Sequence, residues 1–146
     1  MAFDVVARLV ARNLRHPLFS FRVPAGFPSP AQDHLERTIS LDEILEIRAP
    51  HTYLVRAGGD SMIGAGIYDG DLMVVNRSKE AVSGEIVVAA VNGEPTVKRL
   101  HLDDSWPKQV SLRPENPKYA PRYILEGDEL LIWGVVGYSI RCHGQR

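Results

Sequence analysis

The sequence is poor in cysteine and has no long apolar run. Cys142 is the single cysteine among 146 residues, so no disulfide can form within the chain. A fold without disulfides is typical of a reducing compartment. No stretch approaches the roughly 20 apolar residues that a membrane-spanning helix needs. These two absences argue against a disulfide-rich secreted scaffold and a membrane-anchored protein, and we expect a cytoplasmic location.

The sequence also lacks an excess of basic charge and any recognisable metal or cofactor motif. Lys and Arg number 17 against 18 Asp and Glu, a formal net charge of −1, so direct sequence-specific DNA binding is not expected. One cysteine cannot complete a zinc set. No phosphate-binding glycine loop is present, and Asp69 and Asp71 around Gly70 indicate a turn rather than a cation site. We therefore expect no cofactor and no metal. The histidines show no ligand spacing: His16, His34, His51, His101 and His143.

Short apolar runs separated by turns dominate the chain from Thr52 onward. Asn92-Gly93 lies between two of these runs and is a strong hairpin signal. The length favours one compact domain, and the pattern predicts a mainly β fold, a sandwich or partly open barrel. The predicted strands cover 53–57, 72–76, 85–91, 95–100, 109–112, 123–125 and 130–138.

The region before Thr52 is organised differently. Residues 1–15 have apolar positions at helical spacing, whereas 17–30 contain four prolines and are predicted to be extended. Ser29 followed by Pro30 predicts a helix that runs to about Thr38. Ser40-Leu41-Asp42-Glu43 matches a capping box and predicts a second short helix. We assign 1–28 to a flexible N-terminal arm and 29–146 to the β-rich domain.

The glycine-rich stretch from Gly58 to Leu72 connects two predicted strands and contains Ser61. A serine in such a sharp connection can project from a sheet, with free backbone N–H groups around it at Asp60 and Met62. That is the geometry of a nucleophile with an oxyanion hole. The simpler alternative is a Gly/Asp-rich turn whose serine only caps the backbone, and such turns are common.

Lys98, on the return strand of the predicted hairpin, is the residue that could activate Ser61. A serine hydroxyl is a weak nucleophile until a base removes its proton. A lysine can be that base when burial lowers its pKa, and Ser-Lys pairs are a known variant of the serine nucleophile. The alternative for Lys98 is an outward lysine, because strand alternation places it opposite Val97 on the polar face.

Four motifs occur in order along the chain, and together they carry more information than any one of them. Their order resembles the self-cleaving serine peptidases of the LexA and UmuD type, from about Pro17 to about Tyr138. The motifs are Gly59-Asp60-Ser61-Met62, Gly66-Ile67-Tyr68-Asp69-Gly70-Asp71, Gly84-Glu85-Ile86-Val87-Val88-Ala89 and Thr96-Val97-Lys98-Arg99-Leu100.

The resemblance also extends to the proline-rich segment, where Ala25-Gly26-Phe27-Pro28 matches the neighbourhood of the UmuD cleavage site. It implies a LexA- or signal-peptidase-like β-rich domain. It further implies that Ser61 is the nucleophile, that Lys98 is the general base, and that the bond between Ala25 and Gly26 is the one cut.

The same resemblance implies partners and a cellular role. Proteins of this type cleave themselves when a RecA–single-stranded DNA filament promotes the reaction. Only 25 residues precede the expected cleavage site, too few for the DNA-binding module of a LexA-type repressor, so the UmuD branch is favoured. The implied role is a homodimer of the bacterial cytoplasm whose shortened form joins a UmuC-like Y-family polymerase in error-prone translesion synthesis during the SOS response.

Three other functions stay open at the level of sequence. The β-rich domain could serve as a non-proteolytic interaction subunit with Ser61 and Lys98 idle, and Ser61→Ala would then have no effect on function. It could be a peptidase that acts on other proteins, which predicts turnover of added peptides. It could also be a relative of the LexA-type repressors, which the acidic charge balance and the short N-terminal region oppose.

Overall fold

The computed structural model describes residues 14–20, 22–23, 35–105 and 107–144. The chain divides into two units, residues 1–48 and 49–146, and each is described by itself. Three expectations fall wholly or almost wholly outside the described residues: the helical pattern of 1–15, of which 1–13 are not described, the bond between Ala25 and Gly26, and a domain boundary after residue 28. These three stay predictions.

In its described residues the first unit has a small antiparallel sheet followed by a short helix. Strand β1 (His16–Phe19) pairs with β2 (Leu35–Ile39), and helix α2 (Leu41–Leu45) follows directly. The backbone N–H of Glu43 donates to the Ser40 side chain at 3.4 Å, so Ser40 is the N-cap that the capping-box pattern predicts. None of the helices among the described residues has the length and apolar character to span a membrane.

The predicted helix from Ser29 to about Thr38 is wrong over its second half, where β2 lies instead. Thr38 and Ile39 are β-branched and fit a strand better than a helix. Strand β1 offers them a partner, with Thr38 opposite Pro17. Proline cannot donate a ladder hydrogen bond, but it is tolerated there because, among the described residues, β1 is an edge strand. The pairing of β2 with β1 therefore outweighs the local N-cap signal, which favours a helix.

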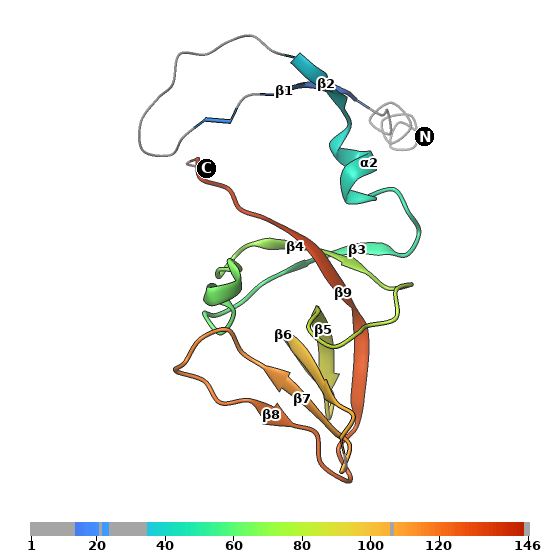
Figure 1. The fold of residues 1–146 in the computed structure, drawn as a ribbon, viewed down its shortest axis with the longest axis vertical. Helices are drawn as coiled ribbons and strands as arrows, with labels where there is room; N and C mark the ends of the chain where they lie inside the picture. The colour runs from blue at the N-terminus through green and yellow to red at the C-terminus, as the bar shows by residue number, and fades with distance from the viewer. Residues whose placement is uncertain (1–13, 21, 24–34, 106, 145–146) are drawn as a thin grey trace, which may run out of the picture. The chain divides into compact units, whose positions relative to one another are not determined.

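The second unit is a single antiparallel sheet, which confirms the predicted mainly β fold. The strand order is β3-β4-β9-β5-β6-β7-β8, so the last long strand runs between β4 and β5 (Figure 1). The strands are β3 (Thr52–Arg56), β4 (Leu72–Asn76), β5 (Ile86–Val91), β6 (Glu94–Asp103), β7 (Gln109–Arg113), β8 (Arg122–Tyr123) and β9 (Leu130–Ile140).

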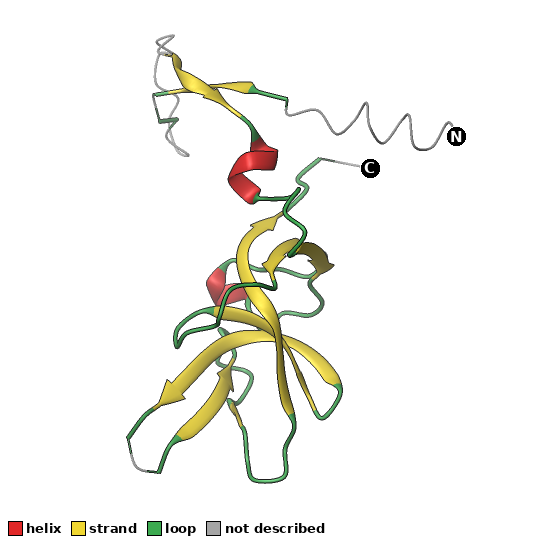
Figure 2. Ribbon diagram, turned by 90° about the vertical axis from the view of Figure 1, so that its right-hand side faces the viewer, coloured by secondary structure: helices red, strands yellow, loops and turns green. Residues whose placement is uncertain are grey.

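Strand β9 changes register twice, and the sheet bends strongly around it (Figure 2). One shift lies opposite Val74 and Val75 of β4, and the other lies opposite Val88 and Ala89 of β5. Such bulges increase the local twist of a sheet. The curvature brings β3, β4 and the β5–β6 hairpin around one core, which places the β3–β4 connection against β6.

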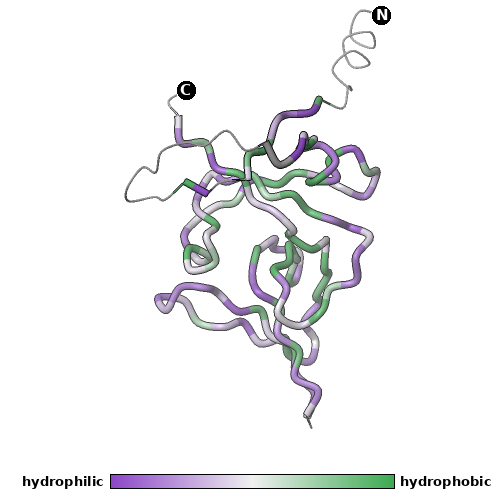
Figure 3. Tube along the Cα trace, turned by 45° about the horizontal axis from the view of Figure 1, so that its top comes forward, coloured by the Kyte–Doolittle hydropathy of each residue, from purple (hydrophilic) through white to green (hydrophobic). Residues whose placement is uncertain are grey.

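Both faces of β5 are buried, which explains its uninterrupted apolar sequence. Val88 belongs to a cluster on one face, and Val87 and Ala89 belong to a second cluster on the other. Figure 3 shows hydrophobic residues concentrated along the strands of this unit. The first cluster comprises Ala57, Met62, Ile67, Met73, Val75 and Val88, and the second comprises Val87, Ala89, Leu100, Leu112 and Val135.

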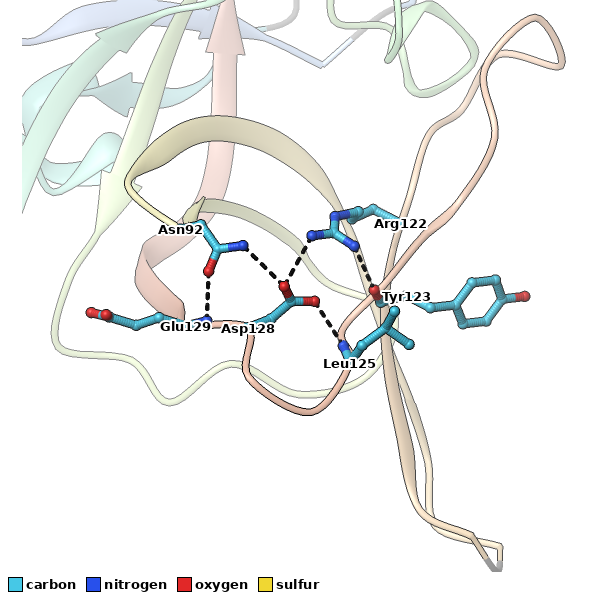
Figure 4. Close-up of polar contacts among 6 residues, drawn as sticks. All are labelled: Asn92, Arg122, Tyr123, Leu125, Asp128 and Glu129. Carbon is cyan, nitrogen blue, oxygen red and sulfur yellow. Dashed lines mark hydrogen bonds and ion pairs between the residues drawn. The ribbon is translucent and has the colours of Figure 1, made fainter.

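The β5–β6 hairpin turns at Asn92-Gly93, as the sequence predicts. Asn92 has φ 51° and Gly93 has φ 85°, the left-handed backbone that this dipeptide favours. The Asn92 amide donates to Asp128 at 2.9 Å, and Arg122 donates to the same carboxylate at 3.2 Å (Figure 4). The network ties the tip of the hairpin to the connection between β8 and β9, so the strand that carries Lys98 is held at its start.

Gly134 provides a test of how closely β9 approaches β4. A Cβ atom at this position would lie 2.6 Å from Cγ1 of Val75 and 2.8 Å from the carbonyl oxygen of Asn76. We expect Gly134→Ala to lower the free energy of unfolding by about 1–3 kcal/mol, the usual cost of overpacking. Gly137→Ala on the same strand is the matched control, because no atom lies within 4 Å of its added Cβ. Equal urea midpoints for the two variants would contradict the described packing.

Candidate active site

Ser61 lies in the connection from β3 to β4, a loop closed at its base by backbone hydrogen bonds. The N–H of Ala57 donates to the carbonyl of Asp71 at 2.8 Å, and the N–H of Gly70 donates to that of Ala57 at 2.8 Å. The side chains of Met62 and Ile67 are buried in the first core cluster and anchor the loop from within. The backbone at Ser61 is thus held in place, because the side chain of the next residue, Met62, is buried in the core.

Lys98 of β6 reaches this serine. Its Nζ lies 3.1 Å from Ser61 Oγ, although 37 residues separate the two along the chain. The same nitrogen donates to Thr96 Oγ1 at 2.8 Å and to the carbonyl oxygen of Val97 at 3.1 Å. The fold therefore brings together the two residues that the sequence singles out, at hydrogen-bond distance.

Burial lowers the pKa of Lys98 below the ordinary value of a lysine. The side chain is half-buried, and no carboxylate is among its hydrogen-bond partners in the described part of the chain. Desolvation penalises the charged form, and no acidic side chain of the described residues offsets that penalty. The arrangement increases the fraction of neutral amine, which is the form that can accept a proton.

A cleft of about 310 Å³ opens beside the pair, and both Ser61 and Lys98 line it. Most of its other walls are apolar or small, from the loop and from β3, β4, β5, β6 and β9. Such a cleft suits a chain with small or apolar side chains next to the reacting bond. The apolar lining residues are Val55, Ala57, Met73, Val88, Pro95, Val97 and Trp133.

Backbone donors are available around the serine. Among the hydrogen bonds of the described residues, none uses the N–H of Asp60, Ser61 or Met62 as its donor. Their neighbours are engaged: the N–H of Gly59 donates to Asp69 at 2.8 Å. Asp69 therefore serves the turn, in line with the turn interpretation of the Asp69-Gly70-Asp71 sequence. The free N–H groups are the kind of donor that an oxyanion needs.

Asp71 is a buried carboxylate at the end of the same loop, and Arg141 after β9 neutralises it. The guanidinium donates to both carboxylate oxygens, at 2.9 and 2.8 Å, and to the carbonyl of Gly66 at 2.8 Å. These hydrogen bonds, with that from the N–H of Tyr68, hold the pKa of Asp71 below its usual range. The guanidinium also lies 3.9 Å from the centre of the Tyr68 ring. This contact fixes the second half of the loop.

Sequence reasoning missed three groups that build the site. Thr96 could have been found, because it lies two residues before Lys98 and on the same face of the strand. Arg141 lies 70 residues from Asp71, and Asn116 lies 56 residues from Asp60, whose carbonyl it binds. No local sequence pattern predicts contacts between residues so far apart in the chain. Ala25 and Gly26 lie outside the described residues, so the cleavage site stays a prediction.

Comparison with known proteins agrees with the family resemblance seen in the sequence motifs. The profile of the family described as Peptidase S24-like matches residues 17–137. The chain is 46% identical to Protein SamA of Salmonella typhimurium over 120 residues, which cover 82% of this chain and 81% of SamA. It is 40% identical to Protein ImpA of Salmonella typhimurium, covering 85% and 82%. It is 42% identical to the LexA repressor of Bordetella avium, covering 84% of this chain and 55% of that repressor.

Proposed function

The chain belongs to the Peptidase S24-like family of LexA/UmuD-type proteins, and from this premise we propose that it is a UmuD-like protein that cleaves itself between Ala25 and Gly26. Ser61 is the nucleophile and Lys98 is the general base. The observation that carries the proposal is the 3.1 Å distance between Lys98 Nζ and Ser61 Oγ in a cleft that suits small side chains.

The surroundings of Lys98 suit a residue that both takes and gives a proton. A neutral amine has two N–H donors and one lone pair. Thr96 Oγ1 and the carbonyl of Val97 accept the two donors, so the lone pair is left for the hydroxyl proton of Ser61. After transfer, the ammonium has three donors and the same three oxygens around it. Both protonation states are therefore satisfied without rearrangement.

The reaction then proceeds in two stages. Ser61 Oγ bonds to the carbonyl carbon of Ala25, while its proton moves to Lys98. The tetrahedral intermediate collapses as the bond to Gly26 breaks and Lys98 returns the proton to the leaving amine. Water, deprotonated by Lys98, then attacks the ester carbonyl; the bond from that carbon to Ser61 Oγ breaks, Lys98 returns the proton to Ser61 Oγ, and the carboxylate of Ala25 is released. The oxygen that becomes negative in each stage is stabilised by the backbone N–H groups around Ser61.

A tethered substrate explains why a small cleft suffices. The bond to be cut belongs to the same protein as Ser61 and Lys98, so its effective concentration is high without tight binding. The basal reaction should speed up as pH rises, because burial lowers the pKa of Lys98 and only its neutral amine can accept the proton of Ser61. Regulation then consists in favouring the arrangement that brings the bond into the cleft.

We propose that a RecA–single-stranded DNA filament promotes that arrangement, and that the shortened homodimer assists a UmuC-like Y-family polymerase in translesion synthesis. This places the protein in the SOS response of the bacterial cytoplasm. The similarity to SamA and ImpA, at 46% and 40% identity, supports the UmuD branch.

Incubation with the filament tests this role. Purified protein at near-neutral pH is mixed with RecA, single-stranded DNA and a slowly hydrolysed nucleotide, and the products are followed by intact mass. We expect the fragment that begins at Gly26 to form at least about tenfold faster than without RecA. The matched control omits only the DNA. Equal rates with and without the filament would contradict the proposed regulation, and an unaltered mass under all conditions would favour a non-proteolytic subunit.

A further inference from the structure

The segment Glu115–Tyr119, here termed the strap, lies between β7 and β8. It forms hydrogen bonds with the backbone on both sides of the nucleophile. The N–H of Glu115 donates to the carbonyl of Ser61 at 2.8 Å, and the carbonyl of Glu115 accepts from the N–H of Gly64 at 2.8 Å. The side-chain amide of Asn116 donates to the carbonyl of Asp60 at 2.9 Å. Tyr119 donates its hydroxyl proton to the carboxylate of Asp60.

These contacts lock the two peptide groups that adjoin Ser61. The Asp60 carbonyl shares a peptide plane with the N–H of Ser61, and the Ser61 carbonyl shares one with the N–H of Met62. In a trans peptide the C=O and the N–H point in opposite directions. Since both carbonyls are held by the strap, both N–H groups point away from it, and neither has an acceptor among the described residues.

We propose that Asn116 and Tyr119 are positioning residues that set the oxyanion donors of the self-cleavage reaction. Hydrogen bonds accepted by a carbonyl polarise its peptide group and strengthen the N–H at the other end. Asn116 is the stronger of the two, because it is 7% exposed and both ends of its amide are used: Oδ1 accepts the N–H of Lys118 at 3.0 Å. The inference rests on the proposed roles of Ser61 and Lys98.

The strap is itself fixed to the strand that carries the base. Arg99 is the neighbour of Lys98 on β6. Its Nε donates to the carboxylate of Glu115, and its Nη1 donates to the carbonyl of Gly84. The N–H of Ile63 adds a longer bond of 3.4 Å to the Asp60 carbonyl. Nucleophile, oxyanion donors and base thus share one framework, but in the described part of the chain neither Asn116 nor Tyr119 is a hydrogen-bond partner of Lys98.

The test compares two strap variants with a matched control. Asn116→Ala and Tyr119→Phe remove the side-chain bonds to Asp60. Tyr123→Phe is the control, since Tyr123 is exposed and its ring points away from the polar network of Figure 4. Two rates are measured from near-neutral to alkaline pH: formation of the Gly26 fragment, and phosphonylation of Ser61 by a fluorophosphonate probe. The melting temperature of each variant is also measured, so that the rates are compared at a temperature where all variants are folded.

Asn116→Ala is expected to lower both rates about 10²-fold, the cost of a misplaced oxyanion donor. Tyr119→Phe is expected to lower them severalfold, and Tyr123→Phe is expected to match the wild type. The pH midpoint should not move, because Lys98 is untouched. A loss of folding alone would instead appear as a lowered melting temperature, with normal rates well below it.

The outcomes separate this inference from the proposed function. A folded Asn116→Ala protein with wild-type rates would overturn the role of the strap and leave the roles of Ser61 and Lys98 intact. Wild-type protein whose Ser61 is labelled but whose Ala25–Gly26 bond is not cut would overturn the cleavage site, and the labelling rates would still decide on the strap. Wild-type protein that neither cleaves nor labels would overturn both.

Discussion

Ser61→Ala is expected to abolish formation of the fragment that begins at Gly26, with a fall in rate of about 10³-fold or more. The hydroxyl is the atom that would bond to the substrate carbonyl, and removal of a nucleophile costs at least this much in serine peptidases. Intact mass against time at alkaline pH measures the effect, because the basal reaction is fastest there.

The fold should survive this substitution. The Ser61 side chain has Lys98 as its hydrogen-bond partner, whereas the loop is held by backbone bonds and by the buried side chain of Met62. Ser139→Ala is the matched control, because Ser139 is an exposed serine of β9 outside the cleft. Continued cleavage in a folded Ser61→Ala protein would assign the reaction to another group or to a contaminating peptidase.

Lys98→Met is expected to have an effect of similar size and to remove the pH dependence as well. In the wild type the rate should rise with pH through the lowered pKa of Lys98 and then level off, because the neutral amine is the active form. Methionine keeps the length and most of the apolar contacts of the lysine stem, but it cannot accept a proton. Lys108→Met, at an exposed lysine outside the cleft, should leave both the rate and the profile unchanged.

The same lysine should affect stability, with a defined sign. Its pKa is lower in the folded state than the unfolded value of about 10.4, so between these two values the unfolded chain binds more protons. The cost of burying the charge is therefore fully present below the folded pKa and disappears as pH rises toward the unfolded one. Relative to Lys98→Met, the wild type should gain unfolding free energy over that window. A wild-type unfolding free energy that falls or stays constant relative to that of Lys98→Met as pH rises through this window would contradict a buried, partly desolvated Lys98.

Much of the β fold is encoded in short stretches of sequence. Strand β5 is apolar throughout because both its faces are buried, and the Asn92-Gly93 turn follows from the left-handed backbone that these two residues tolerate. Strand β2 could not be found in this way, because its partner β1 lies some distance back along the chain and local signals around Ser29 favour a helix. The pairing, rather than the local propensity, decides its structure.

In the site, too, some features follow from short stretches of sequence, and others depend on contacts between distant residues. Ordered motifs singled out Ser61 and Lys98, but alternation along β6 alone would place Lys98 on a polar face. It is half-buried because the Ser61 loop, 37 residues earlier, lies against it. The supports from Asn116, Tyr119 and Arg141 depend on contacts across 56 to 70 residues, and only the folded sheet reveals them.

The most direct test of the central claim is the identity of the new N-terminus when the purified protein is left alone at alkaline pH. Intact mass and N-terminal sequencing are followed over time for the wild type, Ser61→Ala and Lys98→Met, without any filament. The Ser-Lys mechanism predicts one new chain that begins at Gly26, forms faster as pH rises, and is missing from both variants. A stable wild-type mass at every pH, or a fragment that persists in Lys98→Met, would contradict it.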